Sequence, residues 1–208
     1  MTAEGRPFLS GIILAAGAST RMGRPKQLLR LGGRCLLQHV IDAAAASCLD
    51  EIIVVLGHRA EEIREALELR AGRAVRIVLA ADSAQGQSAS LRAGLRAASP
   101  HASAAAILLG DQPTVTSQLI DRVAREYLHS GSAIARPVYS RPDGGRVPGH
   151  PVFLARRIWP WADKLNGDEG ARALISAHPQ WVLEIPIQGE PPVDIDSRAD
   201  YEGVLEEE

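Results

Sequence analysis

The sequence has few cysteines, no long apolar run and no excess of charge of one sign, and each absence excludes a class of protein. Two cysteines in 208 residues are too few for a disulfide framework, and Cys35 and Cys48 lack the spacing of metal ligands. No apolar run approaches the ~18 residues that a membrane-spanning helix needs. A hydrophobic fraction of 46% is nevertheless enough to build a core. Residues 1–208 are therefore expected to form a single domain in a reducing compartment, the cytoplasm, without a membrane partner.

The net charge of −2 conceals two segments of opposite charge. Five cations and no acid lie between Arg21 and Arg34, whereas seven acids and one cation lie between Asp194 and Glu208. A short basic cluster on a nearly neutral chain favours a small anionic ligand over a nucleic-acid partner, which needs a basic face across the whole domain. A solvated loop without a ligand is the alternative interpretation of the five cations.

Short apolar runs rich in β-branched residues alternate with longer helical stretches, which is the pattern of βα units around a mainly parallel sheet. The predicted strands are Leu9–Leu14, Glu51–Leu56, Val75–Ala80, Ala105–Leu109, Ala133–Pro137, Pro151–Leu154 and Trp181–Pro186. The predicted helices are Leu36–Ala46, Ala60–Leu69, Gln87–Ala98, Ser117–His129 and Gly170–His178. The segment from Pro137 to Pro151 is rich in glycine and proline and is interpreted as a functional loop.

Ligands of parallel sheets bind at the carboxyl ends of the strands, so the residues after each apolar run are the candidates for chemistry. The segment Leu14–Lys26 follows the first strand. Its small residues let backbone N–H groups approach a ligand, and the cations Arg21 and Lys26 can neutralise phosphate oxygens. It is not a P-loop, because no Ser or Thr follows the lysine, and it contains no Gly-x-Gly-x-x-Gly turn. It is interpreted as a different phosphate-binding loop.

Carboxylate side chains that could bind a metal ion occur in two later segments of the sequence. Asp111 comes directly after an apolar run and a glycine, and it can hold a Mg²⁺ ion that bridges phosphates. A turn residue or a helix cap is the alternative for Asp111. In an extended chain Asp194 and Asp196 point to the same side. A carboxylate there could complete the metal site, or Asp196 could instead cap a helix that begins with Ser197–Tyr201.

The segment Leu14–Lys26 reads Leu-Ala-Ala-Gly-x-Ser-x-Arg-Met-Gly-x-Pro-Lys. It resembles the signature of the MobA-like NTP transferase family, which contains the molybdenum cofactor guanylyl- and cytidylyltransferases. The resemblance continues, in order along nearly the whole chain, through Gly86–Leu95, Gly110–Pro113, Pro148–Pro151, Gly167–Arg172 and Asp194–Asp196. Ala15-Ala16 and the Gly-His-Pro element make the chain most similar to the cytidylyltransferase branch.

This resemblance implies a three-layer α/β/α Rossmann-like fold, that of the nucleotide-diphospho-sugar transferases, with a mainly parallel mixed sheet. It implies a Mg²⁺-dependent nucleotidyltransferase that moves CMP from CTP to the terminal phosphate of molybdopterin or the molybdenum cofactor and releases pyrophosphate. The residues that would line the base and ribose are Leu14, Ala15, Ala16, Gly17, Gln87 and Ser90. Those that would hold the triphosphate are Arg21, Gly23 and Lys26, and those that would bind Mg²⁺ are Asp111 and Asp196. The catalytic residues implied are Arg21, Lys26 and Asp111.

Other residues are weaker candidates. His150, Arg136 and Arg172 could contact the acceptor, although Arg172 could instead pair with an acid in the preceding turn. Cys35 and Cys48 are expected to be buried thiols without a catalytic role. His58 is assigned no role.

Three alternatives remain open at this point. The enzyme could use GTP or another phosphorylated acceptor, since base preference depends on a few backbone contacts. The chain could be a non-catalytic accessory protein that carries molybdenum cofactor to a molybdenum hydroxylase client. It could also be a flavin-type reductase of small aromatic compounds, an activity of some chains that it resembles.

Overall fold

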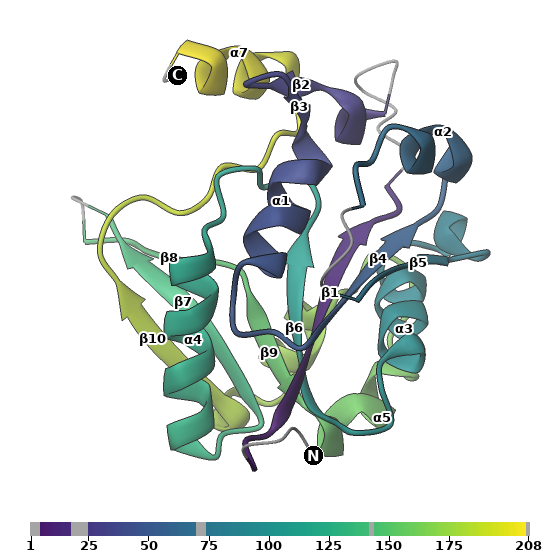
Figure 1. Cartoon of the computed structure of the whole chain (residues 1–208). Helices are drawn as coiled ribbons and strands as arrows, with labels where there is room; N and C mark the ends of the chain where they lie inside the picture. The colour runs from purple at the N-terminus through teal and green to yellow at the C-terminus, as the bar shows by residue number, and fades with distance from the viewer. Residues whose placement is uncertain (1–4, 18–24, 70–73, 142–143, 207–208) are drawn as a thin grey trace.

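A computed structural model describes residues 5–17, 25–69, 74–141 and 144–206, in which one mixed sheet is covered by helices on both faces (Figure 1). The eight strands of this sheet follow the order β10-β7-β9-β6-β1-β4-β5, and β8 pairs with β7. Their bounds are β1 Phe8–Ala15, β4 Glu51–Leu56, β5 Val75–Leu79, β6 Ala102–Leu109, β7 Ile134–Ser140, β8 Arg146–Pro148, β9 Val152–Ala155 and β10 Val182–Ile187. A separate hairpin joins β2 Arg30–Leu31 to β3 Arg34–Cys35.

The helices divide into two layers and one helix outside them. Buried side chains of α1 Leu36–Ala45, α2 Ala60–Glu65 and α4 Ser117–Ser130 pack on one face of the sheet. The other face is covered by α3 Gln87–Ala97, α5 Trp159–Ala162 and α6 Ala171–Ala177. Helix α7 Arg198–Glu206 lies apart, on the β2–β3 hairpin (Figure 1). Within the described ranges, no helix is long and apolar enough to cross a membrane. The expected three-layer α/β/α fold with a mainly parallel mixed sheet is confirmed.

Local sequence explains why these elements form. All six residues of β4 are buried, as in a parallel strand that is covered on both faces. In α4 the buried residues Ile120, Val123, Ala124 and Tyr127 recur at helical spacing and form one apolar stripe. Thr116 caps this helix through a hydrogen bond from the Leu119 N–H, and Gly131 ends it with φ 64°.

The structure corrects several predicted elements. The segment Pro137–Pro151 is not simply a loop, because β7 continues to Ser140 and pairs with β8. Helix α2 ends at Glu65 and not at Leu69, whose side chain is exposed and adds nothing to an apolar stripe. The hairpin β2–β3 and helix α5 were not predicted, since two to four residues are too few to show a hydrophobic period.

A buried carboxylate lies at the amino-terminal end of the sheet. Glu51 Oε1 accepts hydrogen bonds from Ser10 Oγ at 2.6 Å and Ser99 N at 2.7 Å, and its Oε2 accepts one from Arg76 Nη2 at 2.8 Å. Burial alone would raise the pKa of Glu51, but the bonds from Ser10, Ser99 and Arg76 outweigh it and lower the pKa from 4.5. The ionised carboxylate therefore stabilises the folded state.

Replacing Glu51 with Gln is expected to lower the free energy of unfolding at pH 7 by about 1–3 kcal/mol, because charge-assisted hydrogen bonds are lost in a buried place. Since the folded pKa lies below the unfolded value of 4.5, the stabilisation is present above that value and is lost as the pH falls through the folded pKa. Urea unfolding of Glu51→Gln between pH 7 and pH 3 should therefore show a weaker dependence on pH. The control is Glu62→Gln on the exposed surface of α2; an equal loss in both variants would contradict the assigned role of Glu51.

Candidate active site

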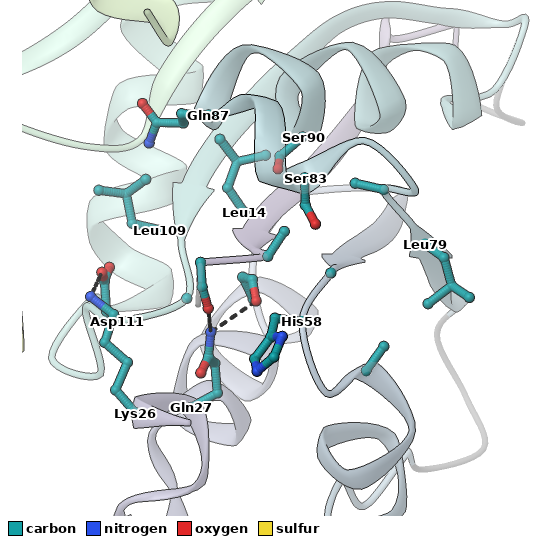
Figure 2. Close-up of a pocket in the computed structure, with 18 of the residues that line it drawn as sticks. Leu14, Lys26, Gln27, His58, Leu79, Ser83, Gln87, Ser90, Leu109 and Asp111 are labelled. Carbon is teal, nitrogen blue, oxygen red and sulfur yellow. Dashed lines mark hydrogen bonds and ion pairs between the residues drawn. The ribbon is translucent and has the colours of Figure 1, made fainter. Parts of the chain in front are cut away.

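A cavity of about 690 Å³ lies at the carboxyl ends of β1, β4, β5 and β6, where ligands of such sheets bind (Figure 2). Its wall contains eight of the residues singled out in the sequence: Leu14, Ala15, Ala16, Gly17, Lys26, Gln87, Ser90 and Asp111. Arg21 and Gly23 lie outside the described residues. The topology thus gathers the described part of the predicted nucleotide site around one cavity.

Lys26 joins the two acids that the sequence suggested as metal ligands. Its Nζ lies 2.5 Å from Asp111 Oδ2 and 2.7 Å from Asp196 Oδ1. The 3₁₀ turn Lys26–Leu28 supplies the lysine, the turn after β6 supplies Asp111, and the segment before α7 supplies Asp196. Burial alone would lower the pKa of Lys26, but the two carboxylates outweigh it and raise the pKa. The lysine is therefore protonated and positively charged beside the cavity.

The donor set suits a divalent ion that also binds phosphates. Asp111 Oδ1 is buried and has no hydrogen-bond partner among the described residues, which is costly for a carboxylate oxygen unless a cation binds it. The described residues contain no group of three or more His, Cys, Asp or Glu side chains that could hold a metal. Mg²⁺ is commonly held by one or two carboxylates together with substrate phosphates and water. Asp111 and Asp196 fit that kind of site.

Asp194 takes a different position from Asp196. Its Oδ1 accepts a hydrogen bond from Gln112 Nε2 at 2.8 Å. Burial raises the pKa of Asp194, and the neighbouring carboxylates of Asp111 and Asp196 raise it further. Gln112, to which no role was assigned from the sequence, therefore orients Asp194, while Asp196 shares Lys26 with Asp111. Asp196 does not cap α7, because Ser197 and Asp200 make the hydrogen bonds there.

Two polar residues of the cavity were missed by sequence reasoning. Gln27 is buried, and its Nε2 donates to Ala15 O at 2.9 Å and to Gly17 O at 3.3 Å, so it holds the turn after β1 (Figure 2). His58, which follows β4, lines the cavity. The only signal for either was its position beside a predicted motif or strand end.

The loop before α6 packs against the start of α3. Gly86 has φ 101°, and a Cβ placed on it would lie 2.3 Å from the carbonyl carbon of Gly167. Ser88 N donates to Gly167 O at 3.1 Å. Gly86, Gln87 and Asp168 all line the cavity. Two motifs about 80 residues apart in the sequence, at Gly86–Leu95 and Gly167–Arg172, thus form one wall.

The three candidate acceptor residues occupy different environments. His150 is half-buried, and burial lowers its pKa to about 4, with the nearby Asp111 carboxylate opposing the shift. Arg136 of β7 pairs with Glu184 of β10, whose second carboxylate oxygen pairs with Arg146. Arg172 is exposed on α6. The His150 imidazole lies close to the Asp111 carboxylate and is uncharged near neutral pH.

Neither cysteine has the surroundings of a nucleophile. Cys35 is buried, as expected. Cys48 was also expected to be buried, but it is only half-buried. Burial raises the pKa of both thiols, and for Cys48 the value reaches about 11 with the help of Asp121. Both thiols are therefore protonated and weakly reactive near neutral pH.

The fold and this cavity define a nucleotidyltransferase. Residues 11–181 match the MobA-like NTP transferase domain, and the chain belongs to this family. It is 31% identical to nicotine blue oxidoreductase of Paenarthrobacter nicotinovorans over 183 residues, which cover 86% of each chain.

Solved structures agree with this assignment. Rv0371c of Mycobacterium tuberculosis H37Rv superposes with a TM-score of 0.82 at 32% identity, covering 96% of this chain and 98% of that one. A further structure of Rv0371c, with a TM-score of 0.78 at 31% identity over 96% and 98% of the two chains, is a complex with manganese. A nucleotidyl transferase from Methanothermobacter matches with a TM-score of 0.77 at 28% identity, covering 96% and 97% of the two chains.

Proposed function

We propose that residues 1–208 act as one domain that transfers CMP from CTP to the terminal phosphate of molybdopterin or a similar cofactor. The observation that carries this proposal is the ionic group of Lys26, Asp111 and Asp196 at the edge of the 690 Å³ cavity. Phosphate-transfer chemistry needs positioning and neutralised charge more than a protein nucleophile. This group supplies one lysine cation and two carboxylates that would bind a second cation.

The reaction is a substitution at the α-phosphorus of the triphosphate. An oxygen of the acceptor phosphate forms a bond to that phosphorus, and the bond from the phosphorus to the bridging oxygen of the β-phosphate breaks. Pyrophosphate leaves with the electron pair of the broken bond. The acceptor phosphate is already ionised near pH 7, since its second pKa is about 6, so no general base is required.

The residues of the chain hold the triphosphate and the base. Leu14, Ala15, Ala16 and Gly17 would face the base and ribose with their backbone groups, and Gln87 and Ser90 would close the base pocket. Lys26 would leave the two carboxylates and turn to the phosphates when the nucleotide enters, with Arg21 and Gly23 completing the phosphate loop. His150 stands beside Asp111 as an uncharged hydrogen-bonding group toward the acceptor, with Arg136 and Arg172 as further candidates.

Asp111 and Asp196 would hold a divalent ion, taken to be Mg²⁺. When bound, the ion neutralises charge on the triphosphate oxygens and on the leaving pyrophosphate. The manganese complex of Rv0371c supports a divalent site in a similar chain. The two cysteines, which are free thiols, suit a reducing compartment such as the cytoplasm.

Pyrophosphate release tests this function. The protein is incubated with molybdenum cofactor, Mg²⁺ and each nucleoside triphosphate in turn. We expect release that requires all three components and is fastest with CTP. Faster release with GTP would retain the reaction and correct the base. Release with none of the triphosphates would overturn the proposal and favour a carrier of the cofactor.

A second candidate is supported by the similarity to nicotine blue oxidoreductase. A reductase of small aromatic compounds needs an electron donor, and a flavin-type reductase would carry that donor as a bound flavin. The absorption spectrum of the purified protein distinguishes the two functions. A flavin band at stoichiometric intensity would favour the reductase, and its absence together with pyrophosphate release would exclude it.

A further inference from the structure

Asp196 needs support from its surroundings to act with Asp111. Its side chain is 59% exposed, and it lies on the connection between β10 and α7, where no strand or helix fixes its direction. A side chain that rotates freely loses conformational entropy when it binds a metal ion. Neighbouring groups that hold a metal ligand in its binding position therefore usually raise the affinity for the metal. The structure shows three groups that hold the segment around Asp196.

The first of these groups is Ile195, the residue before Asp196. Ile195 is fully buried and packs with Leu29, Leu31, Leu36 and Val204 in a small core of its own. Its N–H donates to the carbonyl oxygen of Asp111 at 3.1 Å. The backbone next to one acid is thus tied to the backbone of the other acid.

The second holding group is the carboxylate of Asp200 at the start of α7. Its Oδ2 accepts hydrogen bonds from Asp196 N at 3.1 Å, Ser197 N at 2.7 Å and Ser197 Oγ at 2.8 Å. Ser197 Oγ in turn accepts from Asp200 N at 3.2 Å, which completes a reciprocal cap. The hydrogen bonds between Asp200 and Ser197 are sufficient to cap the helix. The additional bond from Asp196 N to Asp200 holds the backbone of Asp196 in place.

The third holding group anchors α7 to the segment that carries Lys26. Tyr201 Oη donates to the carbonyl oxygen of Arg30 at 2.5 Å, in the hairpin that follows the turn Lys26–Leu28. Val204 of α7 is buried against the same hairpin. Helix α7 therefore connects Asp196 to the chain segment of its ionic partner (Figure 1).

We infer that Asp200 is a positioning residue that directs Asp196 toward Asp111 and so sets the affinity of the site for a divalent ion. This inference rests on the proposed function, because it takes Asp196 as a metal ligand. Asp200 touches neither substrate nor metal in this account. It acts through the backbone of Asp196, with the anchor of Tyr201 keeping α7 in place.

The test is a titration of Mn²⁺ alone, followed by electron paramagnetic resonance, on the wild type, Asp200→Ala and Asp200→Asn. We expect Asp200→Ala to raise the Kd for Mn²⁺ about 10- to 100-fold, as the loss of an outer-shell partner does in other metal sites. Asp200→Asn keeps an acceptor oxygen, so its Kd for Mn²⁺ should lie between those of the wild type and Asp200→Ala. In the transfer assay, the Mn²⁺ concentration needed for half the maximal rate should rise, while the KM for CTP at saturating Mn²⁺ stays at the wild-type value.

Two controls separate positioning from a general loss of stability. Thr116→Ala removes the cap of α4, where Thr116 Oγ1 accepts from Leu119 N at 3.2 Å. Arg198→Ala removes an ion pair with Glu202 on the exposed side of α7. Both should leave the Kd for Mn²⁺ unchanged, and urea unfolding should show Thr116→Ala losing stability as Asp200→Ala does.

The outcomes distinguish this inference from the proposed function. A wild type that binds Mn²⁺ together with an Asp200→Ala variant of equal affinity would overturn the inference and leave the function standing. An equal rise of the Kd in Thr116→Ala would also overturn it. A wild type that neither binds Mn²⁺ nor releases pyrophosphate would overturn both.

Discussion

Replacing Lys26 with methionine is expected to lower kcat/KM for nucleotidyl transfer by about 10²–10³-fold, the usual cost of removing one fixed group that stabilises transition-state charge. The same change should strengthen the binding of Mn²⁺ in the absence of nucleotide, by about tenfold or more. The reason is that Nζ lies 2.5 Å from Asp111 and 2.7 Å from Asp196, where it competes with a metal ion for both carboxylates. Initial rates and an electron paramagnetic resonance titration measure the two effects.

The opposite directions of these effects make the prediction specific. A variant that had simply lost its fold would lose both activity and metal binding. The matched control is Lys164→Met, because Lys164 is the only other lysine in the chain and is exposed beyond α5. It should keep wild-type activity and wild-type affinity for Mn²⁺. Unchanged or weaker Mn²⁺ binding by Lys26→Met would contradict the competition between the lysine and the ion.

Replacing Gly86 with alanine is expected to cause the largest loss of stability among the changes considered. The backbone there has φ 101°, which costs a side-chain-bearing residue about 1–3 kcal/mol. In addition, the new Cβ would lie 2.3 Å from Gly167 C and 2.7 Å from Asp168 N, both backbone atoms that cannot rotate away. We expect a further loss of about 1–3 kcal/mol from this overlap. Urea unfolding measures the sum, and weaker CTP binding should accompany it.

Gly189 provides a control for the cost of placing a side chain at a positive φ. It has φ 98°, but a Cβ on it would meet no atom within 4 Å. Gly189→Ala should therefore show only the strain of the backbone and keep the affinity for CTP. Equal free energies of unfolding for the two variants would show that Gly86 does not pack on the 167–168 loop as described.

The regular elements were predictable where one physical signal dominated. The continuous apolar run of β4 gave Glu51–Leu56 with the observed bounds, and the apolar stripe of α4 located that helix to within one residue. Capping a helix that begins with Ser197–Tyr201 was only one of the possible roles of Asp196. Helix α7 runs from Arg198 to Glu206, where Val204 packs against the β2–β3 hairpin. This packing is a contact between distant segments, and a single sequence does not reveal it.

Eight of the residues that line the cavity were named from the sequence, but Gln27 was missed, and how the charged side chains meet was not predicted. The position after each strand placed Lys26 and Asp111 at one edge of the sheet. Lys26 also pairs with Asp196, which lies 170 residues further along the sequence. A contact between such distant residues is not visible in a single sequence. The roles of Gln27 and Asp200 depend on hydrogen bonds to particular backbone atoms, for which their polar side chains gave no pattern.

The fate of the α- and γ-phosphates of CTP distinguishes nucleotidyl transfer from transfer of the terminal phosphate. CTP labelled with ³²P at either the α- or the γ-phosphate is incubated with the protein, Mg²⁺ and molybdenum cofactor, and the products are separated. If the protein is a nucleotidyltransferase, the α-label moves to the acceptor and the γ-label leaves entirely in pyrophosphate. Transfer of the γ-label to the acceptor, or no transfer of either label from any nucleoside triphosphate, would contradict that function.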